Sequence, residues 1–545
     1  MPSVSSNDEE PLLTAKRRLH DELDSNDDET LFERSTSRSQ HDVNEGAGTR
    51  LTYEEAVEAS GFGLFHWLLL LVCGWANASD AVEIVCVSFL LPTARCDLLL
   101  SSSDMGLLTA SIFLGMMVGG YMWGYLADRR GRCSVLVVSL SVNGLFGGLA
   151  SIAPWFWLFL LLRFISGVGV GGSIPVIFSY FSEFMPRQRR GAMISALATF
   201  WMAGNILAAG LAWLVIPRTW THFSLGKLDF QSWRVFVVLC SIPSLTSAVI
   251  FKMFMPESPK FLMEVSAKIH AGREKEAIHV FRQMFRLNMR GKRVSPPAFS
   301  LHVNINQRVR ETKTRHPCGK LGAILKKGVM PVCQMFDGNL KSRSFILLII
   351  FYCISFGFYG LWMWFPELFV RVEDGGSPCA NVSIPSGHQN QSCYPVKTVV
   401  YKEGFIIAAA NLPGNIFTIL VMDNIGGKLL LSGSLLVSSL SVFLIYVVKT
   451  KTQSLVLACL FSGVSVISWN ALDVLGTELY PTQLRSSALG FFTGAGRVAA
   501  ITGNVAFGNL VDLDCAVPVL LVSAMLLTAG VAALFLPRSK QTELT

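Results

Sequence analysis

The chain has 545 residues, of which 51% are hydrophobic and 15% are charged, whereas an average soluble domain carries about 25% charged residues. This composition excludes a series of soluble domains. The formal net charge of +8 does not indicate nucleic-acid binding, because the basic excess lies between two sets of apolar runs. We find neither a nucleophile–base arrangement nor a Cys/His cluster with metal-ligand spacing, so we expect no enzyme activity, metal site or cofactor.

Residues 1–60 are mostly polar and contain few large apolar side chains, which predicts a disordered cytosolic tail. The tail lacks the pattern of a cleavable signal peptide, so the first apolar run is expected to act as the insertion signal. Asp8, Leu12 and Leu13 match an acidic dileucine sorting signal. A clathrin adaptor reading it would favour a vesicle, endosome or lysosome membrane, with the plasma membrane as a further address; a chance acidic stretch is the alternative.

About twelve apolar runs approach the roughly 20 residues that a helix needs to cross a bilayer. They lie at about 65–92, 105–127, 134–153, 155–184, 192–216, 234–255, 345–369, 399–422, 428–448, 454–478, 488–511 and 517–536. We therefore predict an all-α membrane protein of twelve transmembrane helices. Its predicted parts are an N-terminal six-helix half over 61–255, a cytosolic central loop over 256–343, a C-terminal six-helix half over 344–536 and a cytosolic tail over 537–545.

A short polar pattern occurs twice in the chain at one offset of 295 residues. The repeated charged residues are Asp128, Glu183 and Arg190 in the first set of runs and Asp423, Glu478 and Arg485 in the second. Such a repeat between apolar spans indicates two related halves, and a membrane protein of two related halves is typically a transporter with its site between them.

Asp80 and Glu83 lie within the first predicted span, three residues apart and on one helix face. Because carboxylates in hydrocarbon are costly, such a pair is expected to bind a cation or to exchange a proton. Two other interpretations remain open. The pair could lie near the outer end of the span in water, or it could be neutralised by a structural arginine.

Asp473 and Arg497 lie in the neighbouring tenth and eleventh spans, which favours an ion pair between them. The pair could serve only to hold the second half together. Alternatively, Asp473 could join the first-span acids around a central cavity, or Arg497 could contact an anionic substrate. Trp201, Tyr359 and Trp469 are candidates to stack on a solute, although most membrane aromatics face lipid or form interfacial belts.

The orientation follows from the central segment, which holds a basic excess at Arg286, Arg290, Lys292, Arg293, Arg308, Arg310, Lys326 and Lys327. Such a segment is typical of a cytosolic face near anionic lipid. Both termini are then cytosolic, and the loop at about 370–398 faces outward. Its candidate modification residues are Asn381 and Asn390 for glycosylation and Cys379 and Cys393 for a disulfide.

The string from Gly124 to Arg132 resembles the loop signature of the major facilitator superfamily, and the string from Pro256 to Lys260 resembles the segment after its sixth span. The resemblance implies a cytosolic charge relay that stabilises an outward-facing state. The residues it implies are Asp128, Arg132, Arg163, Glu183 and Arg190 in the first half and Asp423, Glu478 and Arg485 in the second.

Within that superfamily, four strings are similar to the synaptic vesicle glycoprotein 2 family, and the likeness covers about 52–536. They begin at Ser79, Gly167, Phe178 and Trp469. The resemblance implies functional importance for Asp80 and Glu83, and it implies that Trp201, Tyr359, Trp364, Trp469 and Asp473 line a central cavity and a drug site. One departure is the loop after the seventh span, which has roughly 29 residues and is too short for that family's large lumenal domain. Toxin binding through that domain is therefore not carried over.

These observations predict an alternating-access transporter for a small organic cation or sugar-like solute, with possible proton coupling, on vesicle or endolysosomal membranes. Asp80 and Glu83 are expected to bind the cation or proton, with Asp473 and Arg497 on the opposite wall. The alternative is a vesicle membrane protein that no longer transports and acts as a trafficking or regulatory partner.

Overall fold

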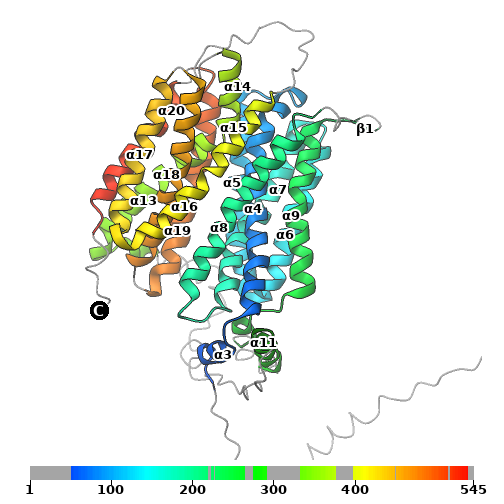
Figure 1. Ribbon diagram of the computed structural model, residues 1–545, viewed down its shortest axis with the longest axis vertical. Coiled ribbons are helices and arrows are strands. Elements are labelled where there is room, and N and C mark those ends of the chain that lie inside the picture. Colours follow the sequence, from blue (N-terminus) through cyan, green and yellow to red (C-terminus); the bar gives the residue numbers. More distant parts are fainter. Residues whose placement is uncertain are drawn as a thin grey trace, which may run out of the picture.

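The computed structural model describes residues 51–218, 223–225, 228–263, 274–290, 332–375, 397–448, 450–480, 482–513 and 516–537. Nearly all of these residues are helical. The strands among them are β1 (Phe223–Leu225) and β2 (Leu228–Phe230), an antiparallel pair in which Phe223 lies opposite Phe230. Figure 1 shows the long helices side by side in two groups, the first-half helices in blue to green and the second-half helices in yellow-green to red.

The first half contains α4 (Leu64–Asp97), α5 (Ser102–Arg130), α6 (Arg132–Leu149), η1 (Ala150–Ile152), α7 (Phe156–Ser182), α8 (Arg190–Val215) and α9 (Ser232–Phe254). The second half contains η5 (Gly338–Leu340), α13 (Lys341–Trp362), α14 (Phe365–Gly375), α15 (Thr398–Ala409), α16 (Asn411–Ile425), α17 (Gly427–Val447), α18 (Lys451–Glu478), α19 (Thr482–Leu510) and α20 (Ala516–Leu534). The two halves meet chiefly where α5 packs on α19 and α8 packs on α15.

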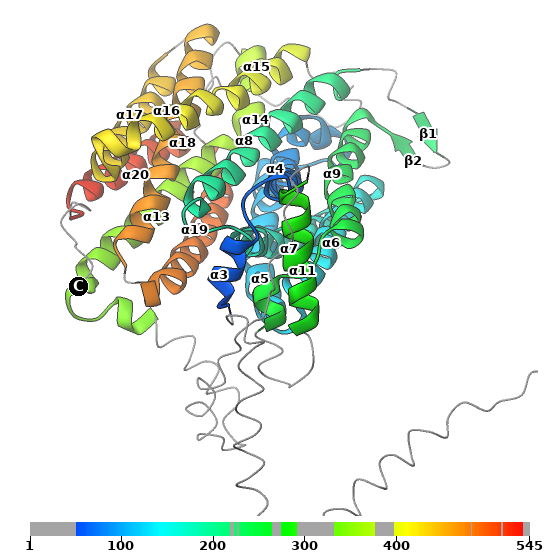
Figure 2. The same ribbon diagram turned by 60° about the horizontal axis from the view of Figure 1, so that its bottom comes forward.

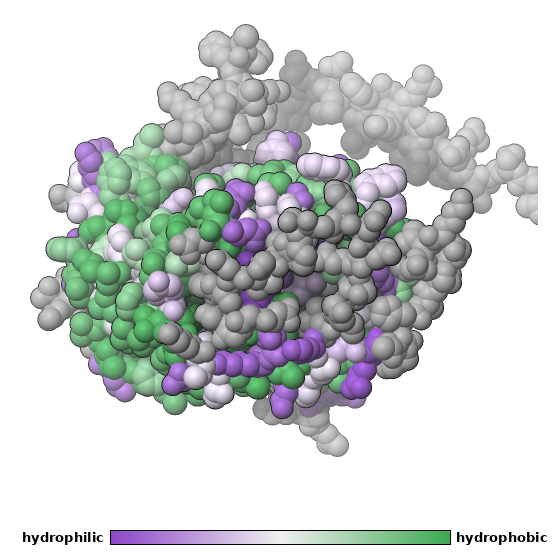
Figure 3. Space-filling model, turned by 90° about the horizontal axis from the view of Figure 1, so that it is seen from above, coloured by the Kyte–Doolittle hydropathy of each residue, from purple (hydrophilic) through white to green (hydrophobic). Residues whose placement is uncertain are grey.

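Eleven segments of the described chain are long and apolar enough to cross a membrane, with α15 and α16 together forming one of them. The 29-residue helix α19 packs between α5 and α13 and completes the set. The predicted fold of twelve transmembrane helices in two halves is therefore confirmed. Viewed from above, hydrophobic residues cover much of the visible rim, while hydrophilic residues gather toward the end face (Figure 3).

Two predicted spans are interrupted. The run predicted at 345–369 ends as α13 at Trp362 and restarts as α14 at Phe365. Pro366 lies in the first turn of α14, where backbone N–H groups have no partner within the helix, so proline's missing N–H costs no hydrogen bond. The eighth span breaks at Ala410, where α15 passes into α16.

The prediction of an unstructured tail up to residue 60 is wrong at its end. Tyr53–Ala59 form helix α3, and Thr52 and Glu55 close a reciprocal capping box at its start. The Thr52 backbone N–H donates to the Glu55 carboxylate and thereby lowers the pKa of Glu55. Tail residues 51–60 thus belong to the folded protein.

The central segment was predicted as a plain polar loop, but it contains helix α11 (Glu274–Asn288). Its buried side chains recur every three or four residues, at Ala277, Val280, Phe281 and Met284. This apolar stripe packs in one cluster with residues of α3 and α4. Figure 2 shows helix α11 beside α3. The segment is therefore partly an integral piece of the first half.

Candidate functional site

The two ends of the bundle differ in how closely the halves approach each other. We call the end next to α3 and α11 the α11 end and the opposite end, where α14 lies, the α14 end (Figure 1). Transporters built from two related halves hold their solute sites in the space between the halves. The end at which the halves lie further apart is therefore the end from which a solute can enter.

At the α14 end the halves are sealed. Arg95 of α4 donates to Glu367 of α14 at 2.8 Å, and Arg371 of α14 bonds to Ser102 of α5 at 3.3 Å. Arg371 also pairs with Asp512 at 2.8 Å. This network joins the first half to the second with charge-assisted hydrogen bonds.

The helix backbones also touch at this end. A side chain added at Gly508 of α19 would lie within 2.8 Å of the Gly106 backbone of α5, so the contact tolerates only glycine. Ser88 of α4 donates to the carbonyl of Met363, between α13 and α14, at 2.8 Å. The α14 end is therefore closed by both packing and hydrogen bonds.

Toward the α11 end the same two helices separate. Tyr121 of α5 points toward Gly494 of α19, yet 78% of Tyr121 is exposed. Beyond the neighbouring backbone of their own helices, no atom of the described residues lies within 4 Å of a Cβ built at Gly124 or Gly490. One hydrogen bond, from Asn415 of α16 to Thr199 of α8 at 3.2 Å, still links the halves along the flank. The space between α5 and α19 is thus open at the α11 end.

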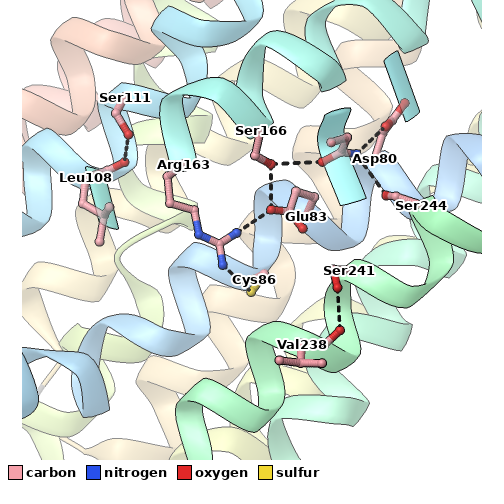
Figure 4. Close-up of polar contacts among 11 residues, drawn as sticks. Asp80, Glu83, Cys86, Leu108, Ser111, Arg163, Ser166, Val238, Ser241 and Ser244 are labelled. Atoms are coloured by element: carbon pink, nitrogen blue, oxygen red, sulfur yellow. Dashed lines mark hydrogen bonds and ion pairs between the residues drawn. The ribbon is translucent and has the colours of Figure 1, made fainter. Parts of the chain in front are cut away.

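Inside the first half, Glu83 forms a fully buried ion pair with Arg163 of α7, with Nη1 and Oε1 2.5 Å apart. Ser166 donates a second hydrogen bond to Glu83 at 2.8 Å. The remaining oxygen of Glu83 and Nε of Arg163 are buried without a hydrogen-bond partner. Figure 4 shows this pair enclosed by α4 and α7.

Asp80 belongs to the same network (Figure 4). Ser173 of α7 donates to it at 2.6 Å, and Asn143 of α6 donates to it at 3.1 Å. Asn143 also donates to Ser244 of α9, and its Oδ1 shares the single hydroxyl proton of Ser166 with Glu83. The network therefore ties four helices of one half together through buried polar groups that are hydrogen-bonded to each other.

This geometry corrects the role expected for the acidic pair. Asp80 and Glu83 both have 0% exposure and lie inside the first half, away from the space between the halves. Glu83 is neutralised by Arg163, which is the alternative that the sequence left open. Neither carboxylate is placed to touch a solute in this conformation, but a buried charge pair with an unsatisfied oxygen can exchange a proton.

Arg163 requires a second correction. The resemblance implied that it belongs to a cytosolic relay with Glu183, but Arg163 lies near the α14 end of α7 while Glu183 follows the other end of that helix. Glu183 instead contacts Arg132 and accepts from Ser258 at 2.5 Å. Arg163 is thus a partner of Glu83 and not a member of the charge cluster at the α11 end.

The charge cluster at the α11 end fixes the turn between α5 and α6. Glu257 accepts the backbone N–H groups of Arg132 and Cys133, at 2.8 and 2.9 Å, at the start of α6, where negative charge is favourable. Arg190 pairs with Glu54 of α3 at 3.2 Å. The implied relay side chains of Asp128, Asp423, Glu478 and Arg485 lie outside the described part of the chain.

A group of aromatic rings lies where the two halves meet above the open space. The ring of Tyr359 in α13 lies 4.9 Å from that of Phe113 in α5 and 6.0 Å from that of Trp469 in α18. The Nε1 of Trp469 is buried without a hydrogen-bond partner. We call these three rings, Phe113, Tyr359 and Trp469, the aromatic wall. The sequence predicted Tyr359 and Trp469 as candidate solute contacts but did not single out Phe113 of the first half.

The predicted ion pair between Asp473 and Arg497 is wrong. The guanidinium of Arg497 lies 5.8 Å from the Tyr359 ring centroid and 6.0 Å from that of Phe113, and no carboxylate among the described residues pairs with it. Asp473 lies one turn beyond Trp469 on the same face of α18 and is exposed. The aromatic faces hold the arginine, and within the described ranges neither Asp473 nor Arg497 forms an ion pair.

The other two predicted aromatics lie elsewhere. Trp364 is fully buried and stacks on Phe507 of α19 with ring centroids 5.6 Å apart, so it belongs to the sealed α14 end. Trp201 of α8 is half-buried and, within the described ranges, has no ring contact with the aromatic wall. The residues predicted for sorting, glycosylation and the disulfide lie outside the described residues, namely Asp8, Leu12, Leu13, Asn381, Asn390, Cys379 and Cys393.

Several residues of these sites were not predicted. Phe113, Asn143, Ser166 and Ser173 are polar or aromatic residues in apolar runs, a weak signal because serine also bonds to its own helix. The bridge from Arg95 to Glu367 involves charges at two predicted span ends, which composition alone does not pair.

Comparison with known proteins places this architecture in a family. The family model described as Major Facilitator Superfamily matches residues 70–385. Synaptic vesicle glycoprotein 2B of Mus musculus is 32% identical, over 90% of this chain and 86% of that protein. The inward-open structure of the xylose transporter XylE from E. coli superposes with a TM-score of 0.63 at 17% identity, covering 88% of this chain and 98% of that one. A structure titled D-xylose-proton symporter superposes with a TM-score of 0.59 at 18% identity, covering 86% and 98%.

Proposed function

Because the chain belongs to the major facilitator superfamily and is a multi-pass membrane transporter by family and fold, we propose that it carries a small organic solute with a cationic group by alternating access. The observation that carries the proposal is the free carboxylate of Asp473 beside the aromatic wall, at the open end of a space that is sealed at its other end. The halves then rock so that the α14 end opens and the α11 end closes.

The chemistry of the wall supports this solute class. A cation gains from the exposed Asp473 carboxylate by a charge-assisted hydrogen bond and from the rings of Tyr359 and Trp469 by cation–π contact. The orphaned Nε1 of Trp469 offers a donor to an acceptor atom of the solute. Arg497, which has no carboxylate partner among the described residues, favours a second, anionic group on the same molecule.

A neutral, sugar-like solute is the second candidate. It is favoured by the mixture of aromatic rings and amide side chains along the space, where Asn470 donates to Asn415 at 2.8 Å. Such a solute would use these amides and Trp469 while leaving Asp473 dispensable. The charge dependence of uptake therefore separates the two candidates.

Coupling to a proton is assigned to Glu83 and Arg163 in this proposal. Protonation of Glu83 would free Arg163 from its partner and change the charge inside the first half. One neighbour in fold is titled a proton symporter, which supports the idea for this chain without naming its solute. Uptake is then expected to depend on a pH gradient and to lose that dependence in Glu83→Gln.

The cellular setting is also a proposal. The α11 end is assigned to the cytosol, where the basic central segment meets anionic lipid. The Asp8–Leu13 segment is assigned to a clathrin adaptor, and the membrane to a vesicle or endolysosome. The similarity to a synaptic vesicle glycoprotein supports this address.

The test is a screen of organic cations, zwitterions and neutral sugars in proteoliposomes, with and without a pH gradient. We expect uptake of a charged solute by the wild-type protein, its loss in Asp473→Asn, and normal uptake in Glu58→Gln, which removes an exposed carboxylate on α3. Solute binding without any uptake would contradict transport and favour the regulatory alternative.

A further inference from the structure

Besides Glu367, the described part of the second half contains another buried carboxylate, which takes no part in the proposed solute site. Glu403 of α15 is 5% exposed. Its Oε1 lies 3.0 Å from the ammonium of Lys451 at the start of α18. Its Oε2 is buried without a hydrogen-bond partner. An ionised carboxylate with one unsatisfied oxygen is costly to bury, whereas a protonated one carries its own donor.

A row of alternating charges connects Glu403 with the surface of the α14 end. Lys451 also contacts Glu373 of α14, and Glu373 pairs with Lys397 at 3.2 Å. The side chain of Lys397 is 58% exposed. The row Lys397, Glu373, Lys451 and Glu403, which we call the charge row, therefore connects the buried carboxylate with the solvent-exposed surface through charged side chains.

Among the described residues, Glu403 makes ionic contact only with the charge row. On its own helix, Lys402 is exposed and Tyr401 is buried, with its hydroxyl near Thr93 of α4. The facing helix α8 presents Gly210 and Trp213 to the next residues of α15. The state of Glu403 therefore depends mainly on Lys451 and, through it, on Glu373.

The next two residues of α15 help to seal the halves. Gly404 packs directly against the Phe89 ring of α4, so closely that a side chain there would lie 2.5 Å from it. The Phe405 ring lies 5.7 Å from that of Trp213 in α8. Any movement of α15 that follows a change at Glu403 is thus transmitted to the contact between the halves.

We propose that Glu403 is a proton-binding site that controls opening of the α14 end. With Glu403 ionised, Lys451 ties the start of α18 to α15 and the seal persists. With Glu403 protonated, Lys451 remains with Glu373 alone and α15 is released from α18. Acidification on the α14 side then favours the conformation open to that side, whichever solute the protein carries.

The test measures the distance between the halves at the α14 end. Spin labels are attached at Leu99→Cys in the first half and Leu513→Cys in the second, both highly exposed positions, in a background whose reactive cysteines are replaced by serine. We expect the wild-type distance distribution to shift to longer distances between about pH 7.5 and about pH 5, where perturbed carboxylates titrate. In Glu403→Gln the long distances are expected at both pH values.

The matched control is Lys402→Gln, which removes a charge from the same turn of α15 without touching the charge row and should respond to pH as the wild type does. A second readout uses infrared difference spectra of the wild type, in which acidification should produce a carboxylic acid band that Glu403→Gln lacks. An unchanged wild-type distribution across this pH range, or a normal pH response in Glu403→Gln, overturns the proposal. Both readouts are independent of transport, so failure of the proposed solute would leave them unaffected.

Discussion

The two halves share one fold, but one pair of opposite charges in each half behaves differently. In the first half, Glu83 and Arg163 neutralise each other inside the helix bundle. In the second half, Asp473 and Arg497 lie in neighbouring helices and remain apart, one exposed and the other against aromatic rings. Paired charges can hold a structure or a proton, whereas unpaired charges facing open space are available to a solute. In our proposals, the unpaired charges of the second half therefore serve recognition, and paired carboxylates in both halves, Glu83 and Glu403, serve proton binding.

The largest expected effect comes from breaking the paired side of this comparison. Arg163→Met leaves Glu83 buried without its cation and should destabilise the protein by about 3–5 kcal/mol. The double variant Glu83→Gln/Arg163→Met should recover most of that loss, because no buried charge then remains unpaired. The measurement is the unfolding free energy in detergent. If Arg163→Met is as stable as the double variant, the unpaired Glu83 is not the cause of the destabilisation.

The second prediction compares the two ends of α5 and α19. Gly508→Trp must displace the Gly106 backbone and should cost about 2 kcal/mol or more while preventing the seal. Gly490→Trp meets open space in this conformation and should fold normally, yet it should stop transport by blocking closure of the α11 end.

Thiol labelling from either side of the membrane checks this second prediction. Gly508→Trp should expose cysteines introduced at the α14 end to the thiol reagent, and Gly490→Trp should keep those cysteines protected. Equal labelling in the two variants would contradict the assignment of a sealed and an open end.

The third prediction concerns the unpaired side. Asp473→Asn should weaken solute binding by roughly ten- to a hundredfold, the size expected for a hydrogen bond to a charged group. Its stability should stay within about 0.5 kcal/mol of wild type, because the exposed carboxylate has no described partner to lose. Equilibrium binding and unfolding measured on the same preparation separate these effects, and a large loss of stability would indicate a structural role.

The smallest expected effect on stability comes from replacing Asp512, which belongs to the seal at the α14 end. Burial raises the pKa of Asp512, but hydrogen bonds with Ser102 and Arg371 outweigh it, so the net pKa lies below the usual value. A lowered folded-state pKa gives stability that is present at neutral pH and is lost as the pH falls through that pKa. Since Asp512 is partly exposed, Asp512→Asn should cost no more than about 1 kcal/mol at pH 7. The difference in unfolding free energy between Asp512→Asn and wild type should shrink at about pH 3. A larger difference at that pH would contradict a lowered pKa of Asp512.

The sequence predicted the features that depend on local pattern. The length of the apolar runs specified the twelve spans, and the repeat at Asp128 and Asp423 specified the two halves. Helix α11 could also have been predicted, because its apolar residues recur at helical spacing, but the polar composition of the segment obscured this signal.

The sequence did not predict which charges pair. Glu83 and Arg163 are 80 residues apart and meet only because α4 packs beside α7. Asp473 and Arg497 are close in sequence but their side chains leave α18 and α19 in different directions, toward open space and toward the aromatic wall. Partner choice between helices depends on helix rotation and rotamers, which spacing along the chain does not specify.

The central claim is that solute contacts Asp473 in the open space and does not contact the buried acids of the first half. Its most direct test compares the reaction of Asp473→Cys and Glu83→Cys with a small hydrophilic thiol reagent added from the α11 side, in the same cysteine-replaced background. We predict that Asp473→Cys reacts readily and that Glu83→Cys stays unreactive with or without solute. Because Asp473→Cys lacks the carboxylate, a transported solute should protect it only at concentrations roughly ten- to a hundredfold above those that saturate the wild-type protein. Rapid, solute-protected labelling of Glu83→Cys together with an unreactive Asp473→Cys would contradict the account.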